Sequence, residues 1–304
     1  MSYLTELTAY LLTHTAGINE ENRKNYVDYF YSLQTADGGF VNRSGCADLY
    51  YTGFALRGLF LLNAVPQDNS RTIKLQMFLQ MQNLHNLNAV EINTMIYCES
   101  LLQFVFGREI SSERKEQYRQ QLNKFKRKDN CFASSEKTPY SSTYHTFLSA
   151  VSFELLGLEE EKQRIPTAPI LERQQKDGGF TELEILHRSG TNPTAAAVAF
   201  LKIRDTVPKE PEDAVRYLAG CQLSSGGFQA NSIIGIADLL SSFTAWTALR
   251  DLNSTETVNF ETLKHFVRNC KTADGGFCGS DWDTQSDAEY AFYGFVLESL
   301  LFQT

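Results

Sequence analysis

The sequence has little proline and few continuous runs of valine and isoleucine. Only 7 of its 304 residues are proline, whereas 21 are phenylalanine and 14 are tyrosine. Scarce Val/Ile runs disfavour a parallel sheet, whose buried strands consist largely of such runs. Abundant aromatic residues favour helices that pack through large side chains. The composition therefore predicts an all-α protein.

Positive charge is also scarce, because 28 Lys and Arg stand against 36 Asp and Glu, a net charge of -8. We expect no nucleic-acid partner, since phosphate binding needs a positive surface. No apolar run approaches the ~20 residues of a membrane span, and no Lys or Arg precedes Arg23, so neither a membrane span nor a signal peptide is expected. The 6 cysteines contain no C-x-x-C pair. A cytoplasmic protein with mostly buried, reduced cysteines is expected.

A Gly-Gly-Phe segment recurs along the chain. It occurs in SLQTADGGFV, RQQKDGGFT, CQLSSGGFQ and KTADGGFCGS, with a worn copy in KRKDNCFA. The Phe residues stand at 40, 132, 180, 228 and 277, so most copies are 48 or 49 residues apart. The first interval, 92 residues, leaves room for a degenerate copy near Asn86. A fixed period in this range is typical of repeat proteins.

Each repeat predicts one outer and one inner helix. Before the first Phe, apolar residues at Tyr26, Phe30 and Leu33 lie on one face of an amphipathic helix. After each Phe and a loop, segments such as DLYYTGFALRGLFLL are apolar on nearly every side, as in a buried helix. The glycines allow the chain to reverse, and an Asp three residues before Phe caps the turn. Pro166 and Pro169 predict a short or displaced outer helix.

Six outer and six inner helices can close into a double ring, an (α/α)6 toroid. We expect a single toroid domain over residues 1–304, with an extra N-terminal helix over 1–16. Its repeats are centred on residues 40, 86 (degenerate), 132, 180, 228 and 277. An open superhelix of the same hairpins is the alternative, but it needs a polar concave face that the inner segments lack.

The Q-x-x-D-G-G-F repeats with their inner helices resemble the β subunits of protein prenyltransferases and, more distantly, squalene-hopene and other class II terpene cyclases. The resemblance covers nearly the whole chain and implies a central cavity for an isoprenoid. The transferases bind zinc through an Asp, a Cys two residues later and a His on the last inner helix. The family pattern places Asp238, Leu240 and Tyr290 at these positions. No closed zinc site is therefore expected, nor another cofactor.

Aromatic residues on the inner segments are the candidate lining of this cavity. Tyr and Trp are costly to bury without a partner for their polar atom, so a cluster of them favours a lumen. The alternative is that these rings fill the core. The polar candidate on the same segments is His145. The aromatic candidates are Tyr51, Phe54, Tyr144, Phe147, Phe243, Trp246, Tyr290 and Tyr293.

Asp48, Asp238 and Asp287 occupy one equivalent position at the start of three inner helices. One interpretation is that each caps its helix. The other is that the carboxylates gather at the mouth of the toroid, where one is protonated and acts as a general acid. The acid motif D-x-D-D of the cyclases has a partial counterpart in DWDT, which adds Asp283 as a catalytic candidate.

We therefore expect a prenyltransferase β-subunit-like protein that binds an isoprenoid, such as a prenyl diphosphate, among aromatic rings. Prenyl transfer without the usual zinc site is the leading activity, and whether the protein is an enzyme stays open. The alternatives are an acid-type terpene cyclase and a non-catalytic lipid-binding or scaffold protein. The resemblance also implies a helical partner subunit, and a homodimer is the other candidate assembly.

Overall fold

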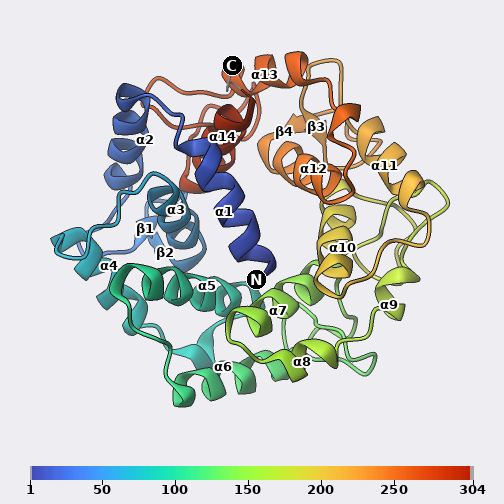
Figure 1. Cartoon of the computed structure of the whole chain (residues 1–304), viewed down its shortest axis with the longest axis horizontal. Coiled ribbons are helices and arrows are strands. Elements are labelled where there is room, and N and C mark those ends of the chain that lie inside the picture. Colours follow the sequence, from blue (N-terminus) through green and yellow to red (C-terminus); the bar gives the residue numbers. More distant parts are fainter. Residues whose placement is uncertain (1, 302–304) are drawn as a thin grey trace. The chain divides into compact units, whose positions relative to one another are not determined.

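The structure is a computed structural model that describes residues 2–301 of the chain. Helices dominate it (Figure 1). Its residues form two compact units. Among the described residues, unit 1 comprises residues 2–3 and 119–266, and unit 2 comprises residues 4–118 and 267–301. None of the described helices is long and apolar enough to cross a membrane. The expectation of one domain stays a prediction.

Unit 2 contains the first and the last inner helix. Its inner helices are α3 (Leu49–Leu61), α5 (Ala89–Phe106) and α14 (Ala288–Leu301). The helix α3 packs against both α5 and α14. The remaining elements are α1 (Tyr3–Thr15), α2 (Glu20–Ser32), α4 (Ser70–Gln80), the 3-10 helix η1 (Leu84–Asn86), the start of α6 (Ser112–Lys124), and the antiparallel strands β1 (Phe40–Val41) and β2 (Ala47–Asp48).

Unit 1 repeats this plan. Its inner helices are α7 (Thr143–Leu155), α10 (Thr191–Ile203) and α12 (Leu239–Asp251), and α10 packs against the other two. The prolines have the predicted effect, because short helices stand where an outer helix was expected. The remaining elements are α8 (Glu159–Gln163), α9 (Ala168–Leu171), α11 (Pro211–Gly220), η2 (Thr255–Thr257), most of α13 (Phe260–Asn269), and the antiparallel strands β3 (Phe228–Gln229) and β4 (Ala237–Asp238).

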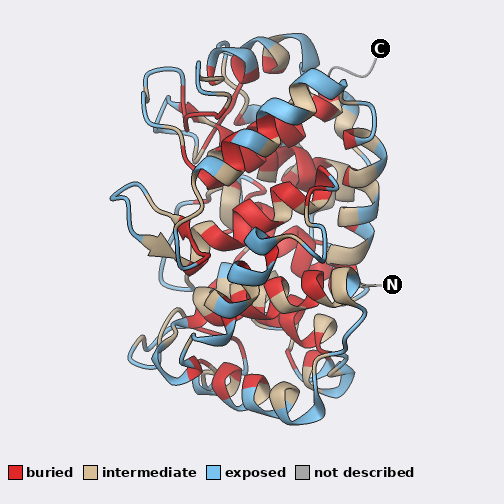
Figure 2. Cartoon of the chain, turned by 90° about the vertical axis from the view of Figure 1, so that its left-hand side faces the viewer, coloured by how far each residue is buried: buried red, intermediate tan, exposed pale blue. Residues whose placement is uncertain are grey.

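The inner helices are buried on most sides, whereas the outer helices mix buried and exposed positions (Figure 2). The Phe of every Gly-Gly-Phe turn is completely buried, and Phe40, Phe180 and Phe228 are each 0% exposed. The backbone N–H of Phe228 donates to the Ser242 hydroxyl of α12 at 2.9 Å, so the turn is also hydrogen-bonded to its inner helix. The recurring motif is therefore a core feature of the fold.

Each turn also docks on the next outer helix. Gly226 has φ of +103°, and a Cβ there would overlap the backbone oxygen of Thr262 in α13. A Cβ on Gly227 would lie 2.6 Å from the Phe266 ring. The Gln222 amide donates to the carbonyl of Gly226 at 2.8 Å and to that of Asn259, just before α13, at 2.9 Å. The predicted Asp caps are also present at all four positions: Asp37, Asp129, Asp177 and Asp274.

The last turn docks on the first outer helix in the same way. Within unit 2, a Cβ on Gly276 would overlap the Tyr29 ring of α2. The hydroxyl of Tyr26 donates to Glu298 of α14, and Lys271 pairs with the same carboxylate at 3.1 Å. The two ends of the repeat array therefore meet inside unit 2, as a closed array requires and an open superhelix does not.

We predict that Gly226→Ala lowers the free energy of unfolding by about 3 kcal/mol or more, since it adds backbone strain to a steric overlap. Gly235→Ala is the control, because Gly235 has φ of +67° and open space around its Cβ position. Gly235→Ala should lower the free energy of unfolding by only about 1 kcal/mol. Urea unfolding of both variants measures the difference. Equal losses would show that the docked turn adds nothing to stability.

Candidate functional site

The aspartates at the start of α3 and α14 cap their helices. The Asp48 carboxylate accepts from the backbone N–H of Tyr50 at 2.8 Å and of Tyr51 at 3.3 Å. The Asp287 carboxylate accepts from the backbone N–H of Tyr290 at 2.9 Å. These bonds satisfy amides that have no partner inside the helix. The structure therefore gives both residues the capping role, and their catalytic role stays a prediction.

Arg43 holds two of the predicted acids. Its guanidinium, from the loop between β1 and β2, binds Asp287 at 2.6 Å and Asp283 at 2.8 Å. The side chain of Asp287 is only 3% exposed, so Arg43 balances an almost fully buried charge. Burial acts to raise the pKa of Asp283, but the Gln285 N–H and Arg43 outweigh it, so that pKa lies below its usual value. The lowered pKa favours the ionised form of Asp283, which cannot donate a proton.

Asp238 differs from these two aspartates. In unit 1 it caps α12 and accepts from both the backbone N–H of Ser241, at 2.7 Å, and the Ser241 hydroxyl, at 2.8 Å. Burial raises the pKa of its carboxyl in spite of these bonds. Leu240 beside it offers no metal ligand. Among the described residues, no three His, Cys, Asp or Glu side chains lie together as metal ligands. The expectation that the protein binds no zinc stays a prediction.

The aromatic candidates of unit 2 form part of one cluster. The ring centroids of Phe54 and Tyr293 lie 5.3 Å apart, and both residues are buried. Tyr50, which sequence reasoning missed, connects the cluster to Tyr51, with centroids 5.6 Å apart. Tyr51 itself is only half-buried. Tyr290 is also half-buried and lies under the guanidinium of Arg43, 5.3 Å from its ring. The outer end of the cluster therefore keeps accessible ring surface.

The aromatic candidates of unit 1 fall into two groups. On α12, Phe243 and Trp246 are 6% and 4% exposed, so they belong to the core. On α7, Tyr144 is 36% exposed, and Phe147 is half-buried. The core interpretation therefore fits the first pair, whereas the second pair keeps ring surface available. A central lumen stays a prediction.

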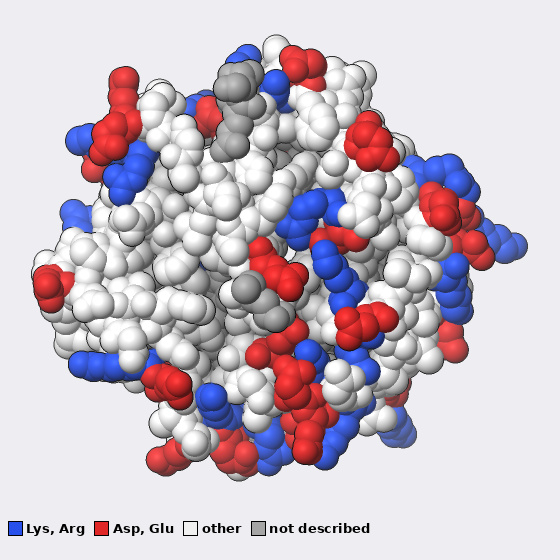
Figure 3. Space-filling model, viewed as in Figure 1, with Lys and Arg blue, Asp and Glu red and all other residues white. Residues whose placement is uncertain are grey.

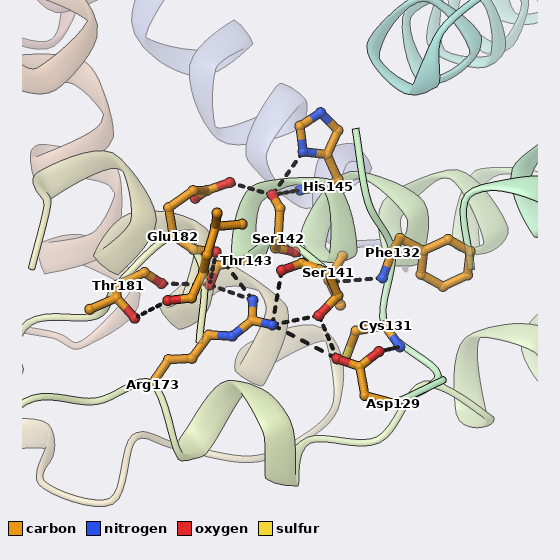
Figure 4. Close-up of polar contacts among 12 residues, drawn as sticks. Asp129, Cys131, Phe132, Ser141, Ser142, Thr143, His145, Arg173, Thr181 and Glu182 are labelled. Atoms are coloured by element: carbon orange, nitrogen blue, oxygen red, sulfur yellow. Dashed lines mark hydrogen bonds and ion pairs between the residues drawn. The ribbon is translucent and has the colours of Figure 1, made fainter. Parts of the chain in front are cut away.

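His145 lies in a polar cluster at the start of α7 (Figure 4). Its Nδ1 is 2.8 Å from the Ser142 hydroxyl, which donates to the Glu182 carboxylate. Burial lowers the pKa of His145 to about 4 and raises the pKa of Glu182. A neutral imidazole is thus connected to a carboxyl group through one hydroxyl. This arrangement can pass a proton from the ring to Glu182.

A buried arginine fixes the backbone around this cluster. Arg173 is 2% exposed and donates to the Thr143 hydroxyl at 3.0 Å and to the Ser141 carbonyl at 3.2 Å (Figure 4). Sequence reasoning found His145 but missed Ser142 and Glu182. The position of Ser142 just before an inner helix was a usable capping signal. Glu182 had none, because only the fold brings it to Ser142.

A family model, the prenyltransferase alpha-alpha toroid domain, matches residues 1–137 and 81–302. The chain belongs to this family. The all-α toroid class predicted from the repeats is thereby confirmed. No curated protein sequence matches the chain.

Solved structures share the toroid fold across most of the chain. Candida albicans protein geranylgeranyltransferase-I, complexed with GGPP, is 16% identical with a TM-score of 0.58 and covers 96% of this chain and 89% of its own. The type II terpene cyclase MstE from Scytonema is 12% identical with a TM-score of 0.60, and the match covers 95% of this chain and 98% of the cyclase. An alpha-1,6-mannanase from Salegentibacter is 13% identical with a TM-score of 0.60, and the match covers 92% of this chain and 97% of the mannanase. Such different enzymes show that the toroid fold does not select the reaction.

We predict that His145→Gln makes the protein less sensitive to acid. The unfolded chain takes up a proton on this histidine near pH 6.5, whereas the folded protein does so only near pH 4. Acidification across this window therefore lowers the free energy of unfolding, and glutamine removes that contribution. Urea unfolding at pH 6.5 and 4.5 measures it, with His85→Gln at an exposed position as the control. The same acid sensitivity in both variants would contradict the prediction.

Proposed function

We propose that the protein binds an isoprenoid chain against the aromatic side chains of its inner helices. The observation that carries the proposal is the incomplete burial of rings on helices that are otherwise buried. Tyr144 is 36% exposed, although Thr143 and Thr146 on the same helix are 0% exposed. Tyr51 and Tyr290 show the same contrast with buried neighbours in unit 2. Accessible aromatic faces of this kind are suited to an apolar ligand.

Similar structures support the choice of ligand. The fungal geranylgeranyltransferase-I was solved with GGPP, and a variant of the Scytonema cyclase with geranylgeranyl dihydroxybenzoate. Both bind a geranylgeranyl chain within the toroid family. At 16% and 12% identity, these ligands come to this chain as part of the proposal.

The proposed reaction is prenyl transfer without zinc. An acceptor must lose a proton as it attacks the prenyl carbon, and His145 is the base in unit 1. Its Nε2 makes no hydrogen bond to a described residue, while Nδ1 is held by Ser142. When Nε2 takes the acceptor proton, Nδ1 passes its own to Ser142, and Ser142 passes one to Glu182. As the new bond forms, the bond between the prenyl carbon and the diphosphate oxygen breaks, and diphosphate leaves with the electron pair. Proton and charge then balance, because the acceptor proton ends on Glu182, which becomes neutral.

Tyr144→Ala should weaken binding of geranylgeranyl diphosphate about 10-fold, since it removes an accessible ring worth roughly 1 to 2 kcal/mol. Tyr140→Ala is the matched control, because Tyr140 is 38% exposed but lies in the loop before α7. Isothermal titration with and without added zinc measures the affinities, which should not depend on the metal. No binding by the wild type, or equal effects of the two variants, would refute the proposal.

The second candidate function is acid-initiated cyclisation. Burial raises the pKa of the carboxyl groups of Asp238 and Glu182, which makes them the available acids. Geranylgeranyl diphosphate incubated with the wild type should then yield cyclic diphosphates, because protonation of an alkene leaves the bond to diphosphate intact, and mass spectrometry after removal of the diphosphate detects their ring systems. Under this alternative, Asp238→Asn or Glu182→Gln reduces their yield by more than about 100-fold, while Asp283→Asn leaves it unchanged. Only linear products would rule the alternative out.

A further inference from the structure

Arg57 is an unpaired cation on the inner helix α3. It makes no hydrogen bond or ion pair with any described residue, and its Nε is buried. Other charged residues near inner-helix ends are paired: Lys202 and Arg250 both bind Asp251, at 2.8 and 2.7 Å. Figure 3 shows acidic and basic side chains interspersed in this way on the viewed face. Arg57 is therefore an exception that needs a physical explanation.

Aromatic rings surround the guanidinium of Arg57. It lies 4.3 Å from the ring centroid of Phe292, 5.1 Å from that of Tyr97 and 5.4 Å from that of Phe54. We call these four residues the Arg57 cage. The ring faces attract the cation, but they accept none of its five directed N–H donors. Leaving the buried Nε–H of Arg57 unpaired costs free energy that an anion would recover.

The helix α1 covers the cage. Leu4, Leu7 and Leu11 of α1 line a cavity of about 10 Å³ together with Arg57 and other residues of unit 2. This space holds one water molecule at most. The cover is mainly apolar. Its polar contacts include a bond from the Thr15 hydroxyl to the Leu61 carbonyl at 3.2 Å and a long contact of 3.5 Å between the hydroxyls of Thr8 and Tyr97. A group larger than water therefore enters this cavity only when α1 moves. The α1 leucines pack on apolar side chains and rings, so another apolar chain can replace them.

We propose that the Arg57 cage binds the diphosphate head of an isoprenoid, whose apolar chain takes the place of the α1 leucines. This inference rests on the proposed function and adds to it a head-group site. The phosphate oxygens accept the N–H donors of Arg57 in the fork geometry that guanidinium groups favour. The helix α1 then acts as a cover that the ligand displaces.

The test compares Arg57→Met, Arg57→Lys and Arg71→Met with the wild type. Arg71 is the matched control, because its guanidinium also lies over a ring, 4.7 Å from that of Tyr31, but on the outer helix α4. Each protein is titrated with geranylgeranyl diphosphate and with the uncharged geranylgeraniol. Arg57→Met should weaken diphosphate binding by 10-fold or more and change geranylgeraniol binding by less than about twofold. Arg57→Lys should retain part of the affinity, and Arg71→Met all of it.

Hydrogen exchange tests the displacement of α1. Binding of geranylgeranyl diphosphate should speed exchange of the backbone amides of residues 4–15 in the wild type and not in Arg57→Met. Unchanged or slower exchange in the wild type would overturn the role of α1 as a displaced cover.

The remaining outcomes separate this inference from the proposed function. Equal losses of both ligands in Arg57→Met, or no loss, would show that Arg57 only packs, while isoprenoid binding stands. If neither lipid binds the wild type, the proposed function fails. Titration with inorganic diphosphate then tests whether Arg57 still forms an anion site. Thermal stabilisation by diphosphate in the wild type but not in Arg57→Met supports the site, and its absence overturns it.

Discussion

The structure depends on one repeated contact, the docking of each Gly-Gly-Phe turn on the next outer helix. Gly226 and Gly227 leave room for the backbone and ring of α13, and Gln222 bonds the two segments together. The same contact joins Gly276 of the last repeat to Tyr29 of the first outer helix. Because α14 also packs against α3, residues from both ends of the sequence share one core. The same helical hairpins could also stack into an open superhelix. The contact between the last turn and the first outer helix distinguishes this chain from that alternative.

Local physics made much of this fold predictable. The repeat period, the amphipathic outer helices and the Asp caps follow from residues within a few positions of one another. Long-range partners could not be predicted in this way. Arg43 and Asp287 are separated by 244 residues in sequence, and Glu182 meets Ser142 only because neighbouring repeats stack. The sequence therefore indicated that the aspartates cap helices. It did not predict that Arg43 pairs with Asp287, or that His145, Ser142 and Glu182 lie together.

The toroid fold leaves the reaction open. It has carried a transferase, a cyclase and a mannanase in similar structures. In this chain, Asp48 and Asp287 cap their helices, and Asp283 and Asp287 form ion pairs with Arg43. Leu240 and Tyr290 stand at two of the three positions where the resemblance implies zinc ligands. What remains for function is accessible aromatic surface, the His145–Ser142–Glu182 connection and the unpaired Arg57. Each supports the proposal made for its own unit: binding of an anionic isoprenoid by Arg57 in unit 2, and proton transfer by the His145 cluster in unit 1.

The most direct measurement is a crystal structure of the protein grown with geranylgeranyl diphosphate, with anomalous data collected at the zinc edge. The account predicts a hydrocarbon chain in contact with the rings of the inner helices, and no anomalous peak at Asp238. A ligand bound on the outer helices, a core that holds no chain at saturating ligand, or a coordinated zinc ion at Asp238 would contradict it.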